Sequence, residues 1–282
     1  MIKTYSKALF LALFYLFPLT ILAQETVSEK TYSVGIVPQH SASKVIRVWA
    51  PLFDKISSST GYNFKVMTSK DIPEFEKKLK SSAYDFAYMN PYHFVVYNNS
   101  PGYRALAKQK NKEIHGILVT HKTSEIVSLK KLSGEKIAFP SPGAFAASIL
   151  TRGSLLKADV SFKPIYVSSH DSVYKAVSKG FFVAGGGVMR TLKNMGEKTR
   201  KNIRILWKSP GYTPHAFAVN PSIPKRVAKS FQKALVDIIN DDNGITILNN
   251  LSMPEGFVKA EDKDWDDVRE LKIIGLDSIK IE

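Results

Sequence analysis

Beyond the first thirty residues, apolar and polar positions follow two rhythms that alternate along the chain. A period of two, or a short apolar run between turn residues, predicts β-strands. These strands cover residues 32–37, 64–68, 85–89, 114–120, 136–139, 162–167, 181–185, 203–207 and 216–219. Apolar residues at helical spacing predict α-helices over residues 41–58, 72–80, 91–98, 128–132, 144–155, 171–178, 188–195, 227–238 and 262–271. This alternation predicts an α/β protein with parallel sheets and crossover helices.

The same rhythm occurs twice, so we expect two α/β lobes. Two crossings between the lobes are implied, one near Ile117–Thr120 and one near His215–Val219. Lobe 1 would then consist of residues 31–118 and 217–282, and lobe 2 of residues 119–216. A small ligand is expected in the cleft between them.

The N-terminus has the pattern of a secretory signal peptide over residues 1–23. Lys3 and Lys7 make a basic start, residues 8–22 are apolar, and the small residue Ala23 ends the segment. The apolar run is short for a membrane span, although a retained signal anchor is the alternative. A lipid anchor would need a cysteine just after the signal, and the chain has none. We therefore expect a free, non-lipidated periplasmic protein.

The composition excludes several kinds of chemistry. With 44% apolar residues, the 282-residue chain can bury a large core without disulfides, and the absence of cysteine rules out thiolate zinc sites. The sequence contains no Walker A, HExxH or GxSxG pattern. We expect a protein that is not an enzyme and has no catalytic residue, metal or cofactor.

The chain is strongly basic. Its formal net charge is +15, which becomes +13 when Lys3 and Lys7 are removed with the signal. The basic residues are scattered in ones and twos, which is typical of a solvated surface and predicts no nucleic-acid partner. Such a surface still attracts small anions. Binding to a polyanion is the alternative function that the charge leaves open.

The most informative segment is FPSPGAFAAS, residues 139–148. A predicted strand ends at Phe139, the residues Pro140, Pro142 and Gly143 break it, and a helix begins. The first amides of a helix lack intrahelical partners, and the helix dipole adds a partial positive charge there. A strand, a tight turn and a helix start therefore predict an anion site. Its members are Ala144, Phe145, Ala146 and Ala147.

Two basic side chains are candidates to join this site. His170 follows Ser168 and Ser169 at a strand-to-helix junction, where it can donate to an anion or serve as a buried structural histidine. Arg190 follows Gly185–Gly187 in the first turn of a predicted helix. A glycine run permits close backbone approach and unusual dihedral angles. The arginine can bind a pair of anionic oxygens, or it can be a surface residue over a turn.

Further candidates lie at another turn and inside the anion segment. Asn90, Tyr92 and His93 begin a helix and can reach a ligand or pack at the helix start. Phe145 can fill the cleft or turn into the core of a lobe. The three tryptophans fit core patterns: Trp49, Trp207 and Trp265.

Five segments, in this order, resemble the periplasmic phosphate/phosphite/phosphonate-binding proteins of ABC transporters, the PhnD-like family. They are VGIVPQHSASKVIRVWAPLFDKIS, YDFAYMNPYHFV, SLKKLSGEKIAF, VSSHDSVYKAV and ILWKSPGYTPHAF. The resemblance covers essentially the whole mature chain. It implies a type II periplasmic binding fold, with two α/β lobes, a two-strand hinge and a ligand in the cleft. It also implies an ABC permease in the inner membrane as partner, and we expect a monomer.

The same comparison of motifs indicates where this chain departs from the pattern of the PhnD-like family that it resembles. Typical phosphonate binders carry a run of hydroxyl residues at the helix start, where this chain has residues 144–147. Positions often held by tyrosine match Ile72 and Met89, whereas His170 is retained. Acidic residues that hold a ligand ammonium match Arg190 and His215. We therefore expect a ligand without an ammonium group, with one end at the helix start and His170 and the other at Arg190.

A periplasmic substrate-binding component of an ABC-type transporter for a phosphonate-like or phosphate-like anion is the favoured function. A ligand-sensing module for a membrane histidine kinase is a second possibility within the same fold. The residues do not separate transport from sensing, and they do not identify the ligand.

Overall fold

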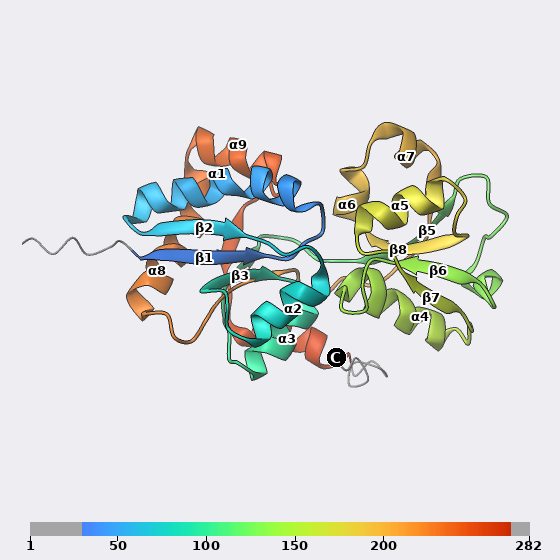
Figure 1. The fold of residues 1–282 in the computed structure, drawn as a ribbon, viewed down its shortest axis with the longest axis horizontal. Helices are drawn as coiled ribbons and strands as arrows, with labels where there is room; N and C mark the ends of the chain where they lie inside the picture. Colours follow the sequence, from blue (N-terminus) through green and yellow to red (C-terminus); the bar gives the residue numbers. More distant parts are fainter. Residues whose placement is uncertain (1–29, 272–282) are drawn as a thin grey trace, which may run out of the picture.

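The computed structural model describes residues 30–271, which form two α/β lobes side by side (Figure 1). The larger lobe has a six-stranded sheet in the order β11-β4-β10-β3-β1-β2, and the smaller lobe has a five-stranded sheet in the order β7-β6-β8-β5-β9. The two-lobe prediction is therefore confirmed. The predicted signal peptide, residues 1–23, lies outside the described residues. Within residues 30–271, no helix has the length and apolar character needed to cross a membrane.

The larger lobe is built from both ends of the described chain. Its strands are β1 (Thr31–Ile36), β2 (Asn63–Met67), β3 (Phe86–Met89), β4 (Arg104–Gln109), β10 (Ala216–Val219) and β11 (Phe257–Lys259). Its longer helices are α1 (Ala42–Thr60), α2 (Ile72–Lys80), α3 (Pro91–Asn99), α8 (Lys225–Asp237) and α9 (Asp242–Asn250). Shorter helical turns are η3 (Ile238–Asn240), η4 (Asp262–Trp265) and α10 (Asp266–Arg269).

The smaller lobe is formed by the middle of the chain. Its strands are β5 (Gly116–His121), β6 (Lys136–Phe139), β7 (Lys163–Tyr166), β8 (Ala184–Val188) and β9 (Ile203–Lys208). Its helices are the 3-10 turn η1 (Leu129–Leu132), the π-helix η2 (Phe145–Leu150), α4 (Thr151–Lys157), α5 (His170–Ser178), α6 (Met189–Lys193) and α7 (Glu197–Lys201).

The predicted parallel strands with crossover helices are present in both sheets, but each sheet also contains antiparallel strands that were not predicted. Strands β1, β2 and β3 pair in parallel, as do β6, β7 and β8. The strands β5 and β10 are antiparallel to their neighbours. Strands β5 and β10 each begin directly after the chain has crossed from the other lobe, so both run away from the cleft. The parallel strands, joined by crossover helices, run toward it.

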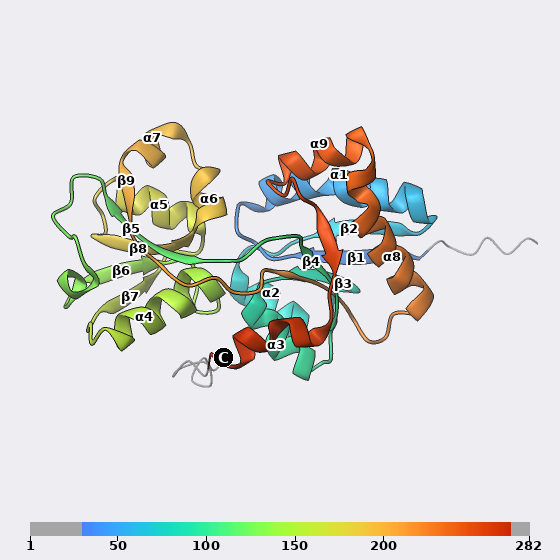
Figure 2. The ribbon, with the colours of Figure 1, turned by 180° about the vertical axis from the view of Figure 1, so that it is seen from behind.

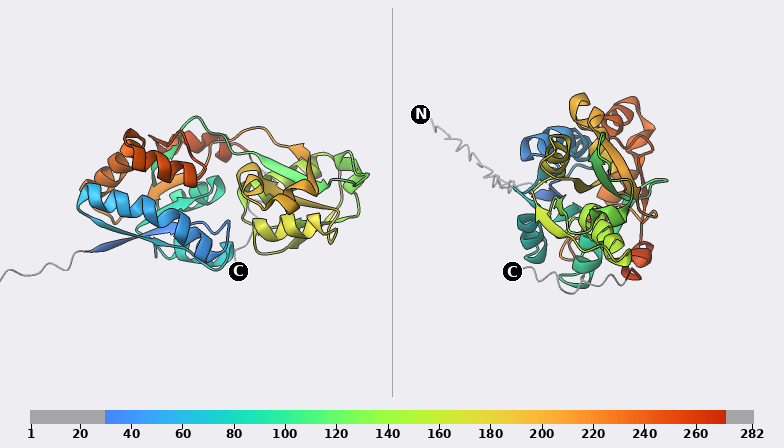
Figure 3. Two further views of the ribbon diagram at one scale, coloured as in Figure 1. Left: turned by 90° about the horizontal axis from the view of Figure 1, so that it is seen from above. Right: turned by 90° about the vertical axis from the view of Figure 1, so that its right-hand side faces the viewer.

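Two extended segments, residues 110–115 and 209–215, connect the lobes along one side of the gap between them (Figures 2 and 3). They pair with each other through Ile114 and Tyr212, whose backbone groups exchange hydrogen bonds of 2.8 and 3.1 Å. This pair is the two-strand hinge that the family resemblance implied. The first connecting segment ends where β5 begins, at Gly116, so the whole of β5 belongs to the sheet of the smaller lobe.

Some elements were not predicted, and the reason is non-local pairing. Strand β4 joins β10 on one side and β11 on the other, so its place depends on residues more than a hundred positions away. Helices α7 and α9 and strand β11 were likewise missed. By contrast, α2, β6 and β10 have the predicted bounds.

The glycine run lies in a strand and not in a loop, so the strand predicted over residues 181–185 is shifted to β8. None of its glycines needs an unusual dihedral angle; each is needed for close packing. A Cβ on Gly186 would lie 1.9 Å from the carbonyl oxygen of Ala147, and one on Gly116 would lie 2.3 Å from that of Ala146. The missing side chains thus let η2 lie directly on β5 and β8.

Aromatic side chains fill the core of the larger lobe. Phe231 of α8 stacks on Phe86 of β3 with ring centroids 4.4 Å apart, and Trp49 of α1 contacts Tyr88 at 4.7 Å. Trp265 is fully buried and donates a hydrogen bond to the Pro214 carbonyl at 2.8 Å. Such rings each bury a large apolar surface, so this core stabilises the sheet that carries one wall of the cleft.

Candidate functional site

The helix start predicted as an anion site faces the larger lobe. Ala144 is the N-terminal residue flanking η2, and its amide donates to the Ser141 carbonyl at 3.2 Å. The alanines and Phe145 are each at most 3% exposed. The predicted continuous helix over residues 144–155 is instead a π-helix that continues as α4. Its first turn still presents amides without intrahelical acceptors.

A small cavity lies at this helix start, with a volume of about 10 Å³, room for about one water molecule. Residues 144–147 line it together with His170 from α5, His215 from the second hinge segment and Asn90. The structure therefore brings most of the sequence-predicted site residues to one place. The other lining residues are Val37, Gln39, Ile72, Ile114 and Val188, so the cavity has no acidic or permanently cationic side chain. We call it the head cavity.

Phe145 lines the head cavity and packs across the cleft into the core of the larger lobe. Its ring meets Tyr212 of the hinge edge-on, with centroids 5.9 Å apart, and it joins the hydrophobic core of the larger lobe. Two hydroxyls flank the alanine run, those of Ser141 and Ser148. Both are buried without a hydrogen-bond partner among the described residues, and neither lines the head cavity. They do not replace the hydroxyl donors that the alanines lack.

His170 is the first residue of α5, and Ser169 caps this helix by accepting from the Ser172 amide. Burial, aided by the nearby positive charge of His40, lowers the pKa of His170 to about 3. The side chain is 3% exposed, with Thr191 Oγ1 at 3.5 Å from Nδ1. His170 is therefore a neutral imidazole, able to donate from one ring nitrogen.

His215 lies opposite, stacked on Tyr88 with ring centroids 5.0 Å apart. Burial is the main cause that lowers its pKa well below the ordinary value, and the charge of Arg190 adds to it. The Nε2 atom lies 3.2 Å from the side-chain amide nitrogen of Gln39. Two neutral histidines and two amides, those of Asn90 and Gln39, thus supply the polar side chains of the head cavity.

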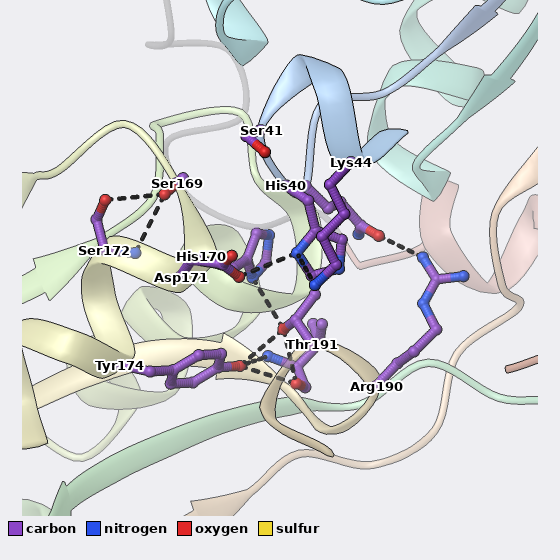
Figure 4. Close-up of polar contacts among 12 residues, drawn as sticks. His40, Ser41, Lys44, Ser169, His170, Asp171, Ser172, Tyr174, Arg190 and Thr191 are labelled. Atoms are coloured by element: carbon purple, nitrogen blue, oxygen red, sulfur yellow. Dashed lines mark hydrogen bonds and ion pairs between the residues drawn. The ribbon is translucent and has the colours of Figure 1, made fainter. Parts of the chain in front are cut away.

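Arg190, in the first turn of α6, is not among the residues that line the head cavity. Figure 4 shows its side chain and its contact with the larger lobe. Its guanidinium donates to Gln39 Oε1 and, at 3.4 Å, to the Tyr88 hydroxyl. Burial raises the pKa of Tyr88, and the Arg190 charge offsets part of that rise. Arg190 therefore reaches from the smaller lobe to two residues of the larger lobe.

Other polar contacts also join the lobes. Asn90 donates to the Gly143 carbonyl at 3.0 Å, and His40 Nδ1 lies 3.0 Å from Asp171 Oδ1 (Figure 4). Burial alone would raise the pKa of Asp171, but the hydrogen bond and charge of His40 and the charge of Lys44 lower it. The lobes are thus in direct contact, and the head cavity is closed between them.

Two predicted site residues lie elsewhere. Met89 is fully buried in β3, and Tyr92 is buried in α3; neither lines the cavities described here. Sequence reasoning missed Gln39, Tyr88 and the His40–Asp171 pair. Gln39 follows the end of β1, and Tyr88 lies near the end of β3. The carboxyl ends of parallel strands are a usual place for ligands, so their positions carried a usable signal.

Two larger cavities border Arg190. One, of about 890 Å³, lies along the hinge, and its wall includes Glu113, Asp267 and the lysines Lys108, Lys110, Lys112 and Lys208. The other, of about 280 Å³, lies between α1 and α6. Among the described residues, no group of three or more potential metal ligands is close enough to hold an ion.

The family model described as "ABC transporter, phosphonate, periplasmic substrate-binding protein" matches residues 34–265. The chain belongs to this family. The phosphonate-binding family comprises substrate-binding proteins and not enzymes, as the sequence predicted. A relative is the probable ABC transporter phosphite binding protein PhnD1 of Prochlorococcus marinus, 25% identical over 182 residues. That alignment covers 57% of this chain and 61% of the relative, so the chain spans about three-fifths of its length.

Solved structures confirm the type II periplasmic binding fold of this family member. The binding-protein component of an ABC phosphonate transporter from Pseudomonas aeruginosa matches with a TM-score of 0.78 and 16% identity, covering 86% of each chain. PhnD1 of Prochlorococcus marinus in complex with methylphosphonate also matches with a TM-score of 0.78. It is 20% identical, and the match covers 86% of this chain and 97% of that chain. At these identities the likeness establishes the fold alone.

Proposed function

We propose that this protein is the substrate-binding component of an ABC-type importer, which captures a small phosphonate-like or phosphate-like anion in the periplasm for an inner-membrane permease. The head cavity is the observation that carries the proposal. It combines a helix start with two neutral histidines and two side-chain amides, and none of its lining residues is acidic. Helix amides favour an anion, and neutral donors add hydrogen bonds without requiring a fixed counter-charge.

We further propose that the ligand carries no ammonium group. Arg190 and His215 stand where the family resemblance implied acidic partners for an ammonium. A ligand cation beside the Arg190 guanidinium would be repelled, and the repulsion increases where water is excluded. Relatives that bind phosphite or methylphosphonate, as their names state, support this choice of ligand class.

Calorimetry with methylphosphonate, phosphite and 2-aminoethylphosphonate tests both parts of the proposal. We expect methylphosphonate and phosphite to bind, and 2-aminoethylphosphonate to bind at least about tenfold more weakly because Arg190 repels its ammonium. Tight binding of 2-aminoethylphosphonate would contradict the ligand class. Failure of all three to bind would contradict the anion-binding function itself.

The proposed location has its own test. If residues 1–23 are a signal peptide, protein from the periplasmic fraction should begin near Gln24. N-terminal sequencing measures this directly. An intact Met1 on membrane-bound protein would instead support the retained anchor.

A further inference from the structure

The cavity between α1 and α6 has the composition of a binding compartment. It is defined here as the α1–α6 cavity, of about 280 Å³, and both lobes contribute to it. Apolar walls come from the larger lobe, chiefly Val48, Trp49 and Leu251. A pocket with apolar walls and a few convergent polar groups is the usual form of a small-molecule site.

The polar side chains of this cavity include amides, two cations and one imidazole. Arg190 comes from α6 and Asn194 follows that helix, while Gln39, Lys44 and Asn250 come from the larger lobe. The imidazole is that of His40, which lies 3.0 Å from Asp171 and 3.4 Å from the Lys44 amino group. Its lining contains no aspartate or glutamate. The hinge cavity differs, because its lysines are mostly exposed and Glu113 and Asp267 share its wall. The α1–α6 cavity is therefore the compartment better suited to a second anionic group.

Val37 and Gln39 line both the head cavity and the α1–α6 cavity. In this closed arrangement the head cavity has room for about one water molecule, so the lobes have to separate slightly there to admit an anionic head, and any organic substituent on that anion has to leave the cavity. A substituent that passes Gln39 enters the α1–α6 cavity. It would displace the contact between Gln39 and Arg190, which frees the guanidinium for the ligand.

We propose that the α1–α6 cavity holds the organic end of the ligand and that this end carries a carboxylate. This inference rests on the proposed function, because it takes the anionic head to occupy the head cavity. Methylene groups of a short chain would lie against Val48 and Trp49, where burying apolar surface is favourable. The guanidinium of Arg190 would bind the carboxylate through two parallel hydrogen bonds, with Lys44 adding positive charge. The ligand class is then a short-chain phosphonocarboxylate.

Four matched probes test this assignment by calorimetry: methylphosphonate, propylphosphonate, 3-phosphonopropionate and 3-aminopropylphosphonate. The last three have chains of similar length and differ mainly in the charge at the far end. We expect 3-phosphonopropionate to bind at least about tenfold more tightly than propylphosphonate, because a charge-assisted bidentate contact is gained. The amine should bind most weakly of the three.

A cavity-filling variant separates this compartment from the head cavity. Val48→Phe places a ring in the α1–α6 cavity and should reduce the affinity ratio of 3-phosphonopropionate to methylphosphonate at least about tenfold. Ile46→Phe is the matched control, because Ile46 lies on the same helix but is 46% exposed and outside the cavity. That variant should leave the ratio unchanged.

Two results would overturn the inference while sparing the proposed function. One is that 3-phosphonopropionate binds no better than propylphosphonate, and the other is that Val48→Phe leaves the ratio intact. If none of the four probes binds, the proposed function fails and the inference fails with it.

Discussion

Individual residues of the cleft differ mainly in how burial sets their charge. His170 and His215 are nearly inaccessible and are held neutral, whereas Arg190 keeps its charge at the edge of the same space. A buried histidine costs free energy when protonated, so burial keeps the side chains that line the head cavity without net charge. The anion of a ligand would reduce that cost, and the histidines can then act as donors to it.

The low pKa of His170 predicts a pH dependence of stability. The folded protein holds His170 neutral down to about pH 3, whereas the unfolded chain protonates it near pH 6.5. The unfolded state therefore binds more protons in this interval, and stability falls as the pH is lowered through it. Between pH 6.5 and 4.5, His170 alone should remove about 2–3 kcal/mol from the free energy of unfolding.

Urea unfolding of the wild type and of His170→Gln at several pH values measures this contribution. The glutamine variant should lose less stability over the same pH interval. The free energies of unfolding of the two proteins should therefore become more similar as the pH falls. Thr191→Val is the control, because it removes the neighbouring hydroxyl without removing a titrating group. Parallel pH curves for wild type and His170→Gln would show that the histidine is not held neutral by the fold.

Arg190 gives a second prediction at the residue scale. Replacing Arg190 with alanine removes the one charged side chain that reaches across from α6 to Gln39 and Tyr88. Losing a desolvated charge-assisted contact should weaken binding of the ligand recovered from native protein by at least about tenfold. Calorimetry measures the loss, and Lys193→Ala, exposed on the same helix, is the control. Equal affinity of Arg190→Ala and wild type would place Arg190 outside the site.

At the scale of elements, the proposed anion site depends on how closely η2 approaches the smaller sheet. Gly116 and Gly186 have no side chain, and the carbonyl groups of Ala146 and Ala147 occupy the space where their Cβ atoms would be. Each of these carbonyl groups is part of the backbone, so it cannot rotate away from an added Cβ as the end of a side chain could. The glycines therefore fix the position of the amides that face the head cavity.

Gly186→Ala should consequently destabilise the protein by at least about 2 kcal/mol, because a Cβ would lie 1.9 Å from the Ala147 carbonyl oxygen. It should also weaken anion binding, since any relief moves the helix start. The matched control is Gly196→Ala, where a Cβ meets nothing within 4 Å and only the loss of a glycine N-cap, about 0.5–1 kcal/mol, is expected. Urea unfolding gives both values. A Gly186→Ala protein as stable as Gly196→Ala would mean that η2 is not held in this close contact.

The sequence predicted elements best where the pattern was local. The bounds of α2, β6 and β10 follow from apolar spacing and flanking turn residues, and the anion turn follows from Pro140, Pro142 and Gly143. The place of β4 could not be predicted because it depends on pairing with distant strands.

The candidate site shows the same division between local and non-local information. His170 and residues 144–147 were found from local motifs, whereas the contact between Arg190 and Gln39 joins residues 151 positions apart. The sequence indicated that the glycine run permits close backbone approach, but not which backbone approaches it, because Ala147 lies outside the local pattern around Gly186.

At the scale of the whole molecule, the lobes are joined by two kinds of connection. The two hinge segments, which pair at Ile114 and Tyr212, are covalent connections. The contacts across the cleft are noncovalent: they are the hydrogen bonds and ion pairs of Asn90, His40 and Arg190 and the packing of Phe145 on the core of the larger lobe. Noncovalent contacts can be broken while the hinge segments keep the lobes joined. The closed arrangement can therefore open by hinge motion, and a ligand that touches both lobes shifts the balance toward closure.

This balance predicts a change of shape that solution scattering can measure. Saturating ligand recovered from native protein should reduce the radius of gyration, because it adds contacts available only when His170 and Arg190 of the smaller lobe meet His215 and Gln39 of the larger lobe. An anion that binds one lobe alone would have no differential affinity for the closed state and could not produce this change. Buffer with 2-aminoethylphosphonate, expected to bind weakly, serves as the comparison. An identical scattering profile with and without saturating ligand would reject closure as the consequence of binding.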